Sequence, residues 1–281
     1  MITSNLTKYP DVNEIIDFFV KRVFPALEKN VLGIYLTGSL SHGAFNYYSS
    51  DIDITVIVHR PVSRSELDSI GRLHREMEEK FEKWARRLEC SYTSVDMLPC
   101  VMPPTEPRPW YWGGDCTLYA EAPYGNEWII NKYFLYSHSI ALFGPSFTKL
   151  SPPVDVEDVR KACVRDLFQE WAPKKSNPEY FGDSHHEAYF ILNLCRILHT
   201  VICSVVGSKK MAASWVQENC GDRWGDLVGN ALEWQYGIEL DARQEAIDFL
   251  DFVISEVSKT GVYTQVVNDA SYIGGDESGS C

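Results

Sequence analysis

The feature of this sequence that most constrains its fold is a pair of apolar segments with polar residues where the two meet. Residues 31–37 are rich in β-branched and aromatic side chains and end at Gly38-Ser39. After eleven further residues, a second segment of alternating pattern begins at Asp51 and Asp53 and runs to residue 59. Because side chains alternate between the two faces of a strand, both carboxylates are expected on one face. The segments are therefore predicted to be strands of one sheet.

Two carboxylates on one face repel each other unless a cation lies between or beside them. Hard divalent cations such as Mg²⁺ prefer oxygen ligands, and a pair of them can steady the attacking and leaving oxygens of a phosphoryl displacement. Gly38 has no Cβ, so Ser39 and nearby backbone N–H groups could approach phosphate oxygens. Ser50 is a further candidate residue for contact with the nucleotide. The plainer alternative is that Ser50 and Asp51 cap a turn while Asp53 faces water.

A third carboxylate is needed as a base or as a further metal ligand, and Glu89 is the candidate. It begins a predicted strand over residues 89–97, which follows Asp53 at about the distance of a helical crossover. Asp96 is the competitor on the same predicted strand. Since seven residues separate the two acids, they would point to opposite faces, and only one could serve. The catalytic and metal-binding set is thus predicted to be Asp51, Asp53 and Glu89.

The hydrophobic periodicity changes near Ser151-Pro152-Pro153, and this change predicts two domains. Residues 1–153 are expected to form an α/β domain, a mixed sheet with flanking helices, and residues 154–263 an all-α helical bundle. Residues 264–281 are expected to be a disordered tail. The predicted helices cover residues 13–29, 65–87, 155–171, 187–205, 210–218 and 241–259, and residues 99–114 are predicted to be a long loop.

Composition and charge narrow the possible partners. The chain carries 39 acidic and 26 basic side chains, for a formal net charge of −13. Binding to nucleic acid requires clusters of Lys and Arg, and the longest such groups here are adjacent pairs, so nucleic acid is not an expected partner. The negative charge instead favours a small polycation as a partner. Without a spanning apolar run or a signal-peptide pattern, we expect a cytoplasmic monomer with no membrane partner. The scattered cysteines are expected to be reduced thiols.

The segment from Gly38 to Asp53 resembles the nucleotidyltransferases of the DNA-polymerase-β-like superfamily. Beyond this core, the chain to about residue 237 resembles the streptomycin/spectinomycin adenylyltransferase family of aminoglycoside-modifying enzymes. The stretches that carry the narrower resemblance are Leu88-Glu89-Cys90-Ser91, Tyr124-Gly125-Asn126-Glu127-Trp128, Ala141-Leu142-Phe143-Gly144-Pro145, Leu194-Cys195-Arg196-Ile197-Leu198 and Lys209 to Trp215.

The resemblance implies roles for residues outside the carboxylate set. Glu89 matches the family's catalytic base, and Arg196 and Lys209 match residues that contact ATP phosphates from the helical domain across the cleft between the domains. Trp128 and Trp171 match tryptophans that line the aminoglycoside site. The family also places acidic residues just before the helix of Arg196, and Glu179, Asp183 and Glu187 are available here, of which we select Asp183 and Glu187. The segment between Trp171 and Arg196 is longer than expected, which leaves the exact acceptor open.

The combined prediction is an aminoglycoside O-nucleotidyltransferase, an activity that the resemblance associates with antibiotic resistance. It would transfer AMP from ATP to a hydroxyl of streptomycin, spectinomycin or both and release pyrophosphate, with two Mg²⁺ ions at the carboxylates. One alternative keeps AMP transfer and changes the acceptor to another small molecule or a protein hydroxyl. The other alternative is a catalytically inactive member of the fold that only binds nucleotide.

Overall fold

The computed structural model describes residues 6–273, which group into two compact units. The first unit comprises residues Met1–Tyr124 and Asn131–Pro153, and the second comprises Gly125–Ile130 and Val154–Cys281. The sequence prediction kept residues 1–153 together, whereas the structure groups the short segment Gly125–Ile130 with the helical unit. Among the described residues, no helix has the length and apolar composition to cross a membrane.

The first unit is built on a mixed six-stranded sheet with the order β5-β4-β3-β2-β1-β6. β2 pairs in parallel with β3, and the other neighbouring strands pair antiparallel. The strands are β1 (Val31–Thr37), β2 (Ile52–Val58), β3 (Leu88–Ser94), β4 (Arg108–Trp112), β5 (Thr117–Ala122) and β6 (Ile140–Phe143). The predicted class, a mixed sheet with flanking helices followed by a helical part, is confirmed.

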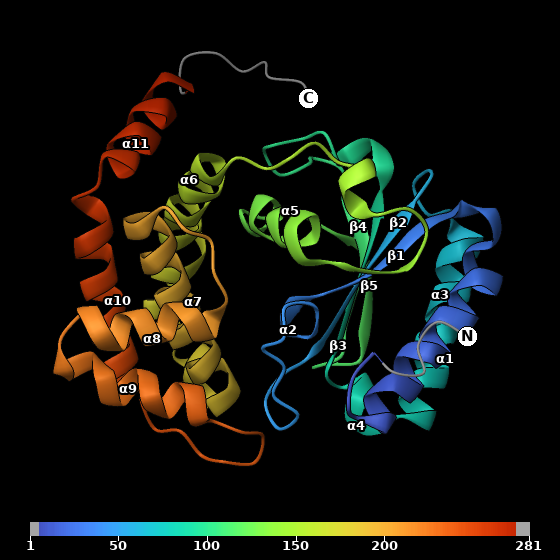
Figure 1. Ribbon diagram of the computed structural model, residues 1–281, viewed down its shortest axis with the longest axis horizontal. Coiled ribbons are helices and arrows are strands. Elements are labelled where there is room, and N and C mark those ends of the chain that lie inside the picture. Colours follow the sequence, from blue (N-terminus) through green and yellow to red (C-terminus); the bar gives the residue numbers. More distant parts are fainter. Residues whose placement is uncertain (1–5, 274–281) are drawn as a thin grey trace. The chain divides into compact units, whose positions relative to one another are not determined.

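One face of this sheet is covered by α1 (Pro10–Leu27) and α3 (Arg64–Lys80), which lie side by side along it in Figure 1. Every second residue of the strands packs against the apolar faces of these helices and forms one hydrophobic core with them. This core includes Ile54 and Val56 from β2 and Ile16 and Phe19 from α1. The opposite residues of β2, including Asp53, face away from this core because strand side chains alternate. The sequence pattern thus assigns one face to packing and leaves the other for polar side chains.

A buried histidine fixes which side of β4 belongs to the core. His74 on α3 is 1% exposed, its ring stacks on Tyr111 with centroids 3.9 Å apart, and its Nε2 is 2.8 Å from the Tyr92 hydroxyl oxygen. Burial lowers the pKa of His74 to about 3, so the ring is neutral at physiological pH. Because Tyr111 is held on the core face, its neighbours along β4 must project from the other face.

The predicted helix over residues 65–87 is two helices in the structure. α3 begins with a capping box in which Ser63 and Glu66 bond reciprocally, and it ends at Lys80, where the Phe81 N–H bonds to the Met77 carbonyl. A one-turn helix, α4 (Glu82–Ala85), follows. The break matters for the site, because after it Arg87 lies just before β3, where its carbonyl accepts from the Ile52 N–H at the start of β2.

The predicted long loop over residues 99–114 is wrong in its second half. Residues 108–112 form β4, which pairs with β3 and then turns into β5, so the irregular part is shorter than expected. The alternation in Arg-Pro-Trp-Tyr-Trp followed by Gly113-Gly114 is a strand and turn signal. The density of proline and tryptophan masked it. α2 (Gly38–Ser41), α5 (Glu127–His138) and β6 were also not predicted.

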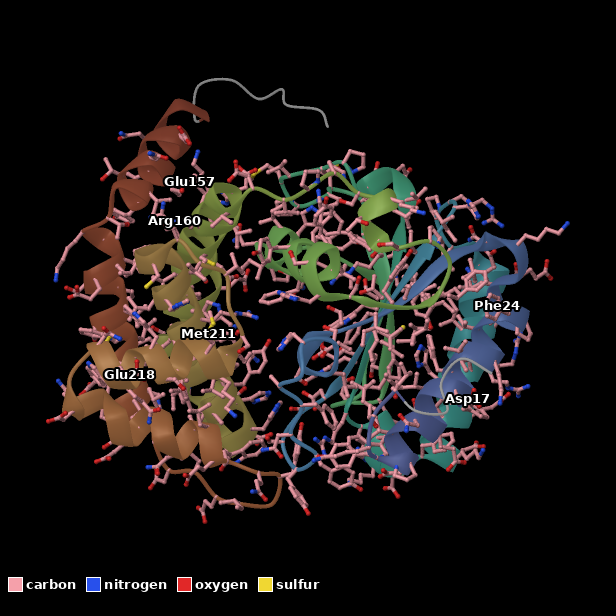
Figure 2. All side chains as sticks on the ribbon, viewed as in Figure 1. Asp17, Phe24, Glu157, Arg160, Met211 and Glu218 are labelled. Atoms are coloured by element: carbon pink, nitrogen blue, oxygen red, sulfur yellow. The ribbon has the colours of Figure 1, made fainter. Side chains whose placement is uncertain are left out.

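The second unit is helical, and the chain between its first two long helices is irregular. α6 (Val156–Asp166) continues into a π-helical turn, η4 (Leu167–Trp171), which two 3₁₀ turns follow before α7 (Ser184–Cys203). On α6, Arg160 pairs with Glu157 at 2.6 Å and donates to the Val201 carbonyl of α7 at 2.8 Å, which joins the two helices (Figure 2). The remaining helices are α8 (Lys209–Asn219), α9 (Asp222–Glu233), α10 (Arg243–Ser258) and α11 (Gly261–Ile273).

Two of these helices correct the sequence prediction. α9 was not predicted, and α11 continues to Ile273, so the tail predicted from residue 264 is wrong for residues 264–273. Residues 274–281, the rest of that predicted tail, lie outside the described residues.

Candidate active site

Strand register places two of the three predicted carboxylates directly beside each other. In the parallel pair of β2 and β3, Asp53 is the partner of Glu89, and on the other side Asp53 faces Thr37 of β1. Directly opposed residues of neighbouring strands project from the same face. Asp53 and Glu89 therefore share the face that lies away from the α1 and α3 core. Of the predicted site residues, this is the pair that the sheet itself brings together.

Gly38 is required by the position of the Asp53 side chain. Its φ of +61° lies in the left-handed region, and a Cβ at this position would lie 1.8 Å from Asp53 Oδ2. No side chain larger than hydrogen fits that space, so the turn brings backbone directly against the carboxylate. Ser39 follows in the one-turn helix α2, where its carbonyl accepts from the Ala44 N–H at 3.0 Å. The structure thus places the predicted phosphate-contacting turn beside Asp53.

Asp51 lies just before β2 and faces a buried arginine. Arg87 Nε is 3.7 Å from Asp51 Oδ1, and the Arg87 side chain is 6% exposed. The same guanidinium donates to the carbonyl of Tyr47 at 3.0 Å and to the carbonyl of Ser50. Ser50 also uses its hydroxyl oxygen to accept from the Asn46 N–H at 2.9 Å. Arg87 therefore holds the loop between Gly38 and β2 and sets the surroundings of Asp51.

Arg87 packs against the aromatic ring of Trp84. Its guanidinium carbon lies 4.6 Å from the centroid of the Trp84 ring. Trp84 Nε1 and the Tyr47 hydroxyl both donate to Asp11 Oδ2 at 2.7 Å. Burial raises the pKa of Asp11, but the hydrogen bonds from Tyr47 and Trp84 outweigh it and the pKa is lowered overall. Asp11 lies in the first turn of α1 and links this helix to the loop.

The competitor to Glu89 does not lie on the strand. β3 ends at Ser94, and Asp96 is in a 3₁₀ turn, Val95–Met97, that follows it. The assumption that the two acids share one strand is therefore wrong. Glu89 is the acid that pairs with Asp53 in the sheet.

The described residues contain no group of three or more His, Cys, Asp or Glu side chains arranged to hold a metal ion. The predicted set of three carboxylate ligands is therefore not assembled as a cage. Mg²⁺ usually binds to proteins through one or two carboxylates, with waters and substrate phosphates as its other ligands. The adjacent acids Asp53 and Glu89 fit this second arrangement, and the backbone of Gly38 lies directly against the Asp53 carboxylate.

Three predicted residues of the helical unit are connected through Tyr189 on α7. Lys209, the first residue of α8, has its ammonium 3.7 Å from the centroid of the Tyr189 ring, and the Trp171 ring lies 5.9 Å from the same ring. Asn193 donates to the Tyr189 carbonyl at 2.7 Å and accepts from Arg196 at 2.8 Å. Lys209 and Trp171 thus meet at the Tyr189 ring, which the sequence did not single out, whereas Arg196 is linked through Asn193 to the Tyr189 backbone carbonyl.

Asp166 is a buried carboxyl within the same neighbourhood. It is 6% exposed and accepts from Trp171 Nε1 at 2.6 Å. Burial raises its pKa to about 6, although the Trp171 hydrogen bond and the nearby charge of Arg196 lower it. Arg196 therefore has a carboxylate near it inside the unit, which is the ordinary structural use of such an arginine.

The other predicted substrate residues have local structural partners or are buried. Trp128 on α5 is 5% exposed. Asp183 caps α7 by accepting from the His185 N–H at 2.8 Å and is exposed. Glu187 is 4% exposed, and its Oε2 accepts from the Ala242 N–H at 2.8 Å ahead of α10. The geometry of Glu187 is that of a support for the segment leading into α10.

The comparisons with known proteins agree with this division of the chain. Residues 19–102 match the family model described as the nucleotidyltransferase domain, and residues 149–258 match the aminoglycoside adenylyltransferase C-terminal domain. In the search of curated proteins, an aminoglycoside (3'') (9) adenylyltransferase of Escherichia coli is 28% identical over 126 residues, which are 43% of this chain and 45% of the relative. The chain thus spans less than half the length of that relative.

Two further proteins show how far the similarity extends. A spectinomycin 9-adenylyltransferase of Staphylococcus aureus is 26% identical over 194 residues, covering 66% of this chain and 70% of the relative. Among solved structures, the spectinomycin adenyltransferase AAD(9) from Enterococcus faecialis, crystallised with ATP and spectinomycin, superposes with a TM-score of 0.71. That match has 20% identity and covers 88% of this chain and 99% of the other, so it shows a shared fold.

The Gly38 turn and the paired acids lie within residues 19–102, the part of the chain that matches the nucleotidyltransferase domain model. Residues 149–258 match the aminoglycoside adenylyltransferase C-terminal domain model, so the resemblance predicted from the sequence is confirmed in both of its parts.

Proposed function

We propose that this protein transfers AMP from ATP to a hydroxyl group of a small cationic acceptor, an aminoglycoside such as streptomycin or spectinomycin. The observation that carries the proposal is the in-register pair Asp53 and Glu89, together with a glycine turn that has no room for a Cβ beside Asp53. Two acids thus share one face of the sheet, and a glycine turn lies against one of them. The named relatives that act on aminoglycosides or spectinomycin support the choice of acceptor.

In the proposed reaction, Glu89 accepts the proton of the acceptor hydroxyl, and the hydroxyl oxygen attacks the α-phosphorus of ATP. The new oxygen–phosphorus bond forms as the bond between the α-phosphorus and the bridging oxygen breaks, and pyrophosphate leaves. Asp53, with Asp51 just before the same strand, would provide negative oxygen ligands for Mg²⁺. When bound, Mg²⁺ would neutralise triphosphate charge and steady the attacking and leaving oxygens.

The residues of the helical unit are proposed to serve the substrates. Arg196 and Lys209 carry fixed positive charge that suits phosphate oxygens, and Trp171 has an aromatic face that suits a sugar ring or a cation. Trp128 and Asp183 keep the acceptor-binding role that the resemblance implies. Glu187 is better explained as a structural residue, because its carboxylate already accepts from the Ala242 backbone.

Isotope placement tests the reaction class. The protein is incubated with Mg²⁺ and ATP labelled at the α- or the γ-phosphorus, with streptomycin, spectinomycin or no acceptor. We expect α-label to appear on the drug and γ-label to appear only in pyrophosphate. Transfer of γ-label to the acceptor would show a kinase instead, and no label transfer to either drug would reject the proposed acceptors.

A further inference from the structure

Three exposed residues of α8 form a stripe that carries opposite charges at its two ends. We call Lys210, Ser214 and Glu218 the α8 stripe. They follow one another at intervals of four residues, which keeps them on nearly the same face of the helix. Figure 2 shows Met211, the neighbour of Lys210, and Glu218 toward opposite ends of α8. The two charges of the stripe are therefore separated along the helix.

Neither charge of the α8 stripe is paired within the part of the chain that the structure describes. Ion pairs on a helix surface join residues three or four apart. Four residues from Lys210 and from Glu218, the helix has Ser214, and three residues from them it has Ala213 and Trp215. An ion pair within α8 is therefore excluded for both charges.

Each charge also lies at the end of α8 that disfavours it. The N-terminus of a helix carries partial positive charge and the C-terminus partial negative charge. Lys210 is the second residue of α8, and Glu218 is the last but one. A second α8 laid antiparallel reverses this arrangement, because its negative end lies beside Lys210 and its positive end beside Glu218.

A two-fold axis through Ser214 pairs the charges of two copies. In such a symmetric contact, Lys210 of each copy meets Glu218 of the other, since both residues are four positions from Ser214. Serine is small, so the two helices can approach closely at the axis. Packed helices lie about 8–10 Å apart, a distance that a lysine and a glutamate side chain span together. The stripe is therefore complementary to a second copy of itself.

An open hollow along the α8 stripe offers apolar surface for the same contact. Its volume is about 480 Å³, and Met211, Trp215 and His199 of α7 contribute to its lining. Met211 is 42% exposed, whereas His199 is 6% exposed and meets the Trp215 ring edge-on with centroids 5.5 Å apart. Burial lowers the pKa of His199, so its ring is neutral at physiological pH and adds no charge to the hollow. Met211 of a second copy, which is unbranched and apolar, can fill part of such a hollow.

We infer that the α8 stripe and its hollow form a two-fold interface at which two copies of this protein associate through antiparallel α8 helices. The sequence predicted a monomer, because only the structure shows that this stripe is exposed. Interfaces that bury less than about 1,200 Å² are weak and transient, and a contact limited to one helix of each copy belongs to this class. The dimer is therefore expected to exchange with the monomer. The inference does not depend on the proposed AMP transfer.

Sedimentation equilibrium of the full chain from about 5 to about 500 µM tests the interface. The variants are Lys210→Glu, Glu218→Lys and the double exchange, in which the two charges change places. Each single variant sets like charges against each other at both ends of the interface, so we expect dimer affinity to fall at least tenfold. The double exchange restores opposite pairs, and its affinity should lie within about threefold of wild type.

Lys29→Glu and Glu245→Lys are the matched controls. They make the same charge changes at exposed residues elsewhere, on the 3₁₀ turn η1 (Glu28–Asn30) and on α10. Both should associate as wild type does. Urea unfolding of the single variants separates the interface from the fold. Because each removes a charge that opposes the dipole of α8, its monomer should be at least as stable as that of wild type.

Four results would overturn the inference. The first is a wild type that stays monomeric over the whole concentration range, and the second is single variants that associate as tightly as the controls. The third is a double exchange that does not recover association. The fourth is an equal loss of association in the control variants, which would show that net charge, and not the α8 stripe, governs the dimer.

Discussion

At the scale of single residues, the site depends on contacts that leave little freedom. Asp53 fills the space where residue 38 would carry a Cβ, and Glu89 stands beside Asp53 in register. The sequence predicted both carboxylates and the glycine because strand alternation and spacing are local properties. It did not predict Arg87, since its role arises from carbonyls and a carboxylate that come from a loop dozens of residues earlier. In the sequence, Arg87 is one member of the adjacent basic pair Arg86-Arg87, which gives no local sign of this role.

Gly38 and Gly43 form a natural pair for testing the turn. Both have positive φ, +61° and +75°, but a Cβ on Gly43 meets nothing within 4 Å, whereas one on Gly38 meets the Asp53 carboxylate. Each alanine substitution should cost about 1 kcal/mol of unfolding free energy from backbone strain. Only Gly38→Ala should in addition reduce kcat of AMP transfer by a hundredfold or more. Urea unfolding and steady-state kinetics measure the two effects, and equal activity in the two variants would show that the contact with Asp53 is dispensable.

Arg87 should be sensitive to its shape as well as to its charge. Its planar guanidinium donates to the carbonyls of Tyr47 and Ser50 and faces Asp51. Arg87→Met leaves these acceptors without a donor and should lower the unfolding free energy by roughly 2–3 kcal/mol. Arg87→Lys keeps the charge but has one ammonium in place of the planar fork, so an intermediate loss is expected. Denaturant unfolding measures both, and a methionine variant as stable as wild type would refute the proposed clamp.

At the scale of secondary-structure elements, long periodic segments were predictable and short ones were not. The strand over residues 31–37 was predicted with the bounds that the structure has, because its side chains are buried on a regular pattern. The hairpin of β4 and β5 was missed, since three aromatic residues in a proline-rich stretch look irregular until the partner strands are known. The sequence therefore did not place Trp110, Trp112 and Tyr119 on strands of the sheet.

The junction of α6 and η4 should make the stability of the protein depend on pH. Burial holds the pKa of Asp166 at about 6, above its ordinary value of 3.8, so between these values the native protein keeps a proton that the unfolded chain has lost. This contribution is present below about pH 4 and is lost as the pH rises through 6. It is on the order of 2–3 kcal/mol for a shift of this size.

The unfolding free energies of wild type and Asp166→Asn, measured from pH 4 to 7, test this contribution. The asparagine does not titrate, so its stability relative to wild type should rise by that amount across the range. Trp171→Phe removes a donor to the carboxylate and should move the wild-type transition to higher pH. A difference between wild type and Asp166→Asn that stays constant with pH would contradict the raised pKa.

At the scale of the whole molecule, the chain combines an acid-bearing sheet with a helical unit in which Lys209 and Trp171 contact the Tyr189 ring and Arg196 lies near Asp166. The sequence predicted this order of an α/β part and a helical part because hydrophobic periodicity changes once along the chain. The grouping around Tyr189 could not be predicted, since it depends on how α7, α8 and η4 pack within their unit. The candidate roles of the helical residues toward ATP and acceptor are proposals that binding and kinetic measurements can test.

The central claim is that Glu89 is the base of an AMP transfer. Its most direct test is acceptor-dependent release of pyrophosphate from MgATP by wild type, Glu89→Gln and, as a control, Glu121→Gln, which changes an exposed acid on the edge strand β5. We expect Glu89→Gln to lower kcat by about 10²–10⁴-fold with little change in affinity for ATP, and Glu121→Gln to behave as wild type. Pyrophosphate release that survives in Glu89→Gln would contradict the assignment of the base.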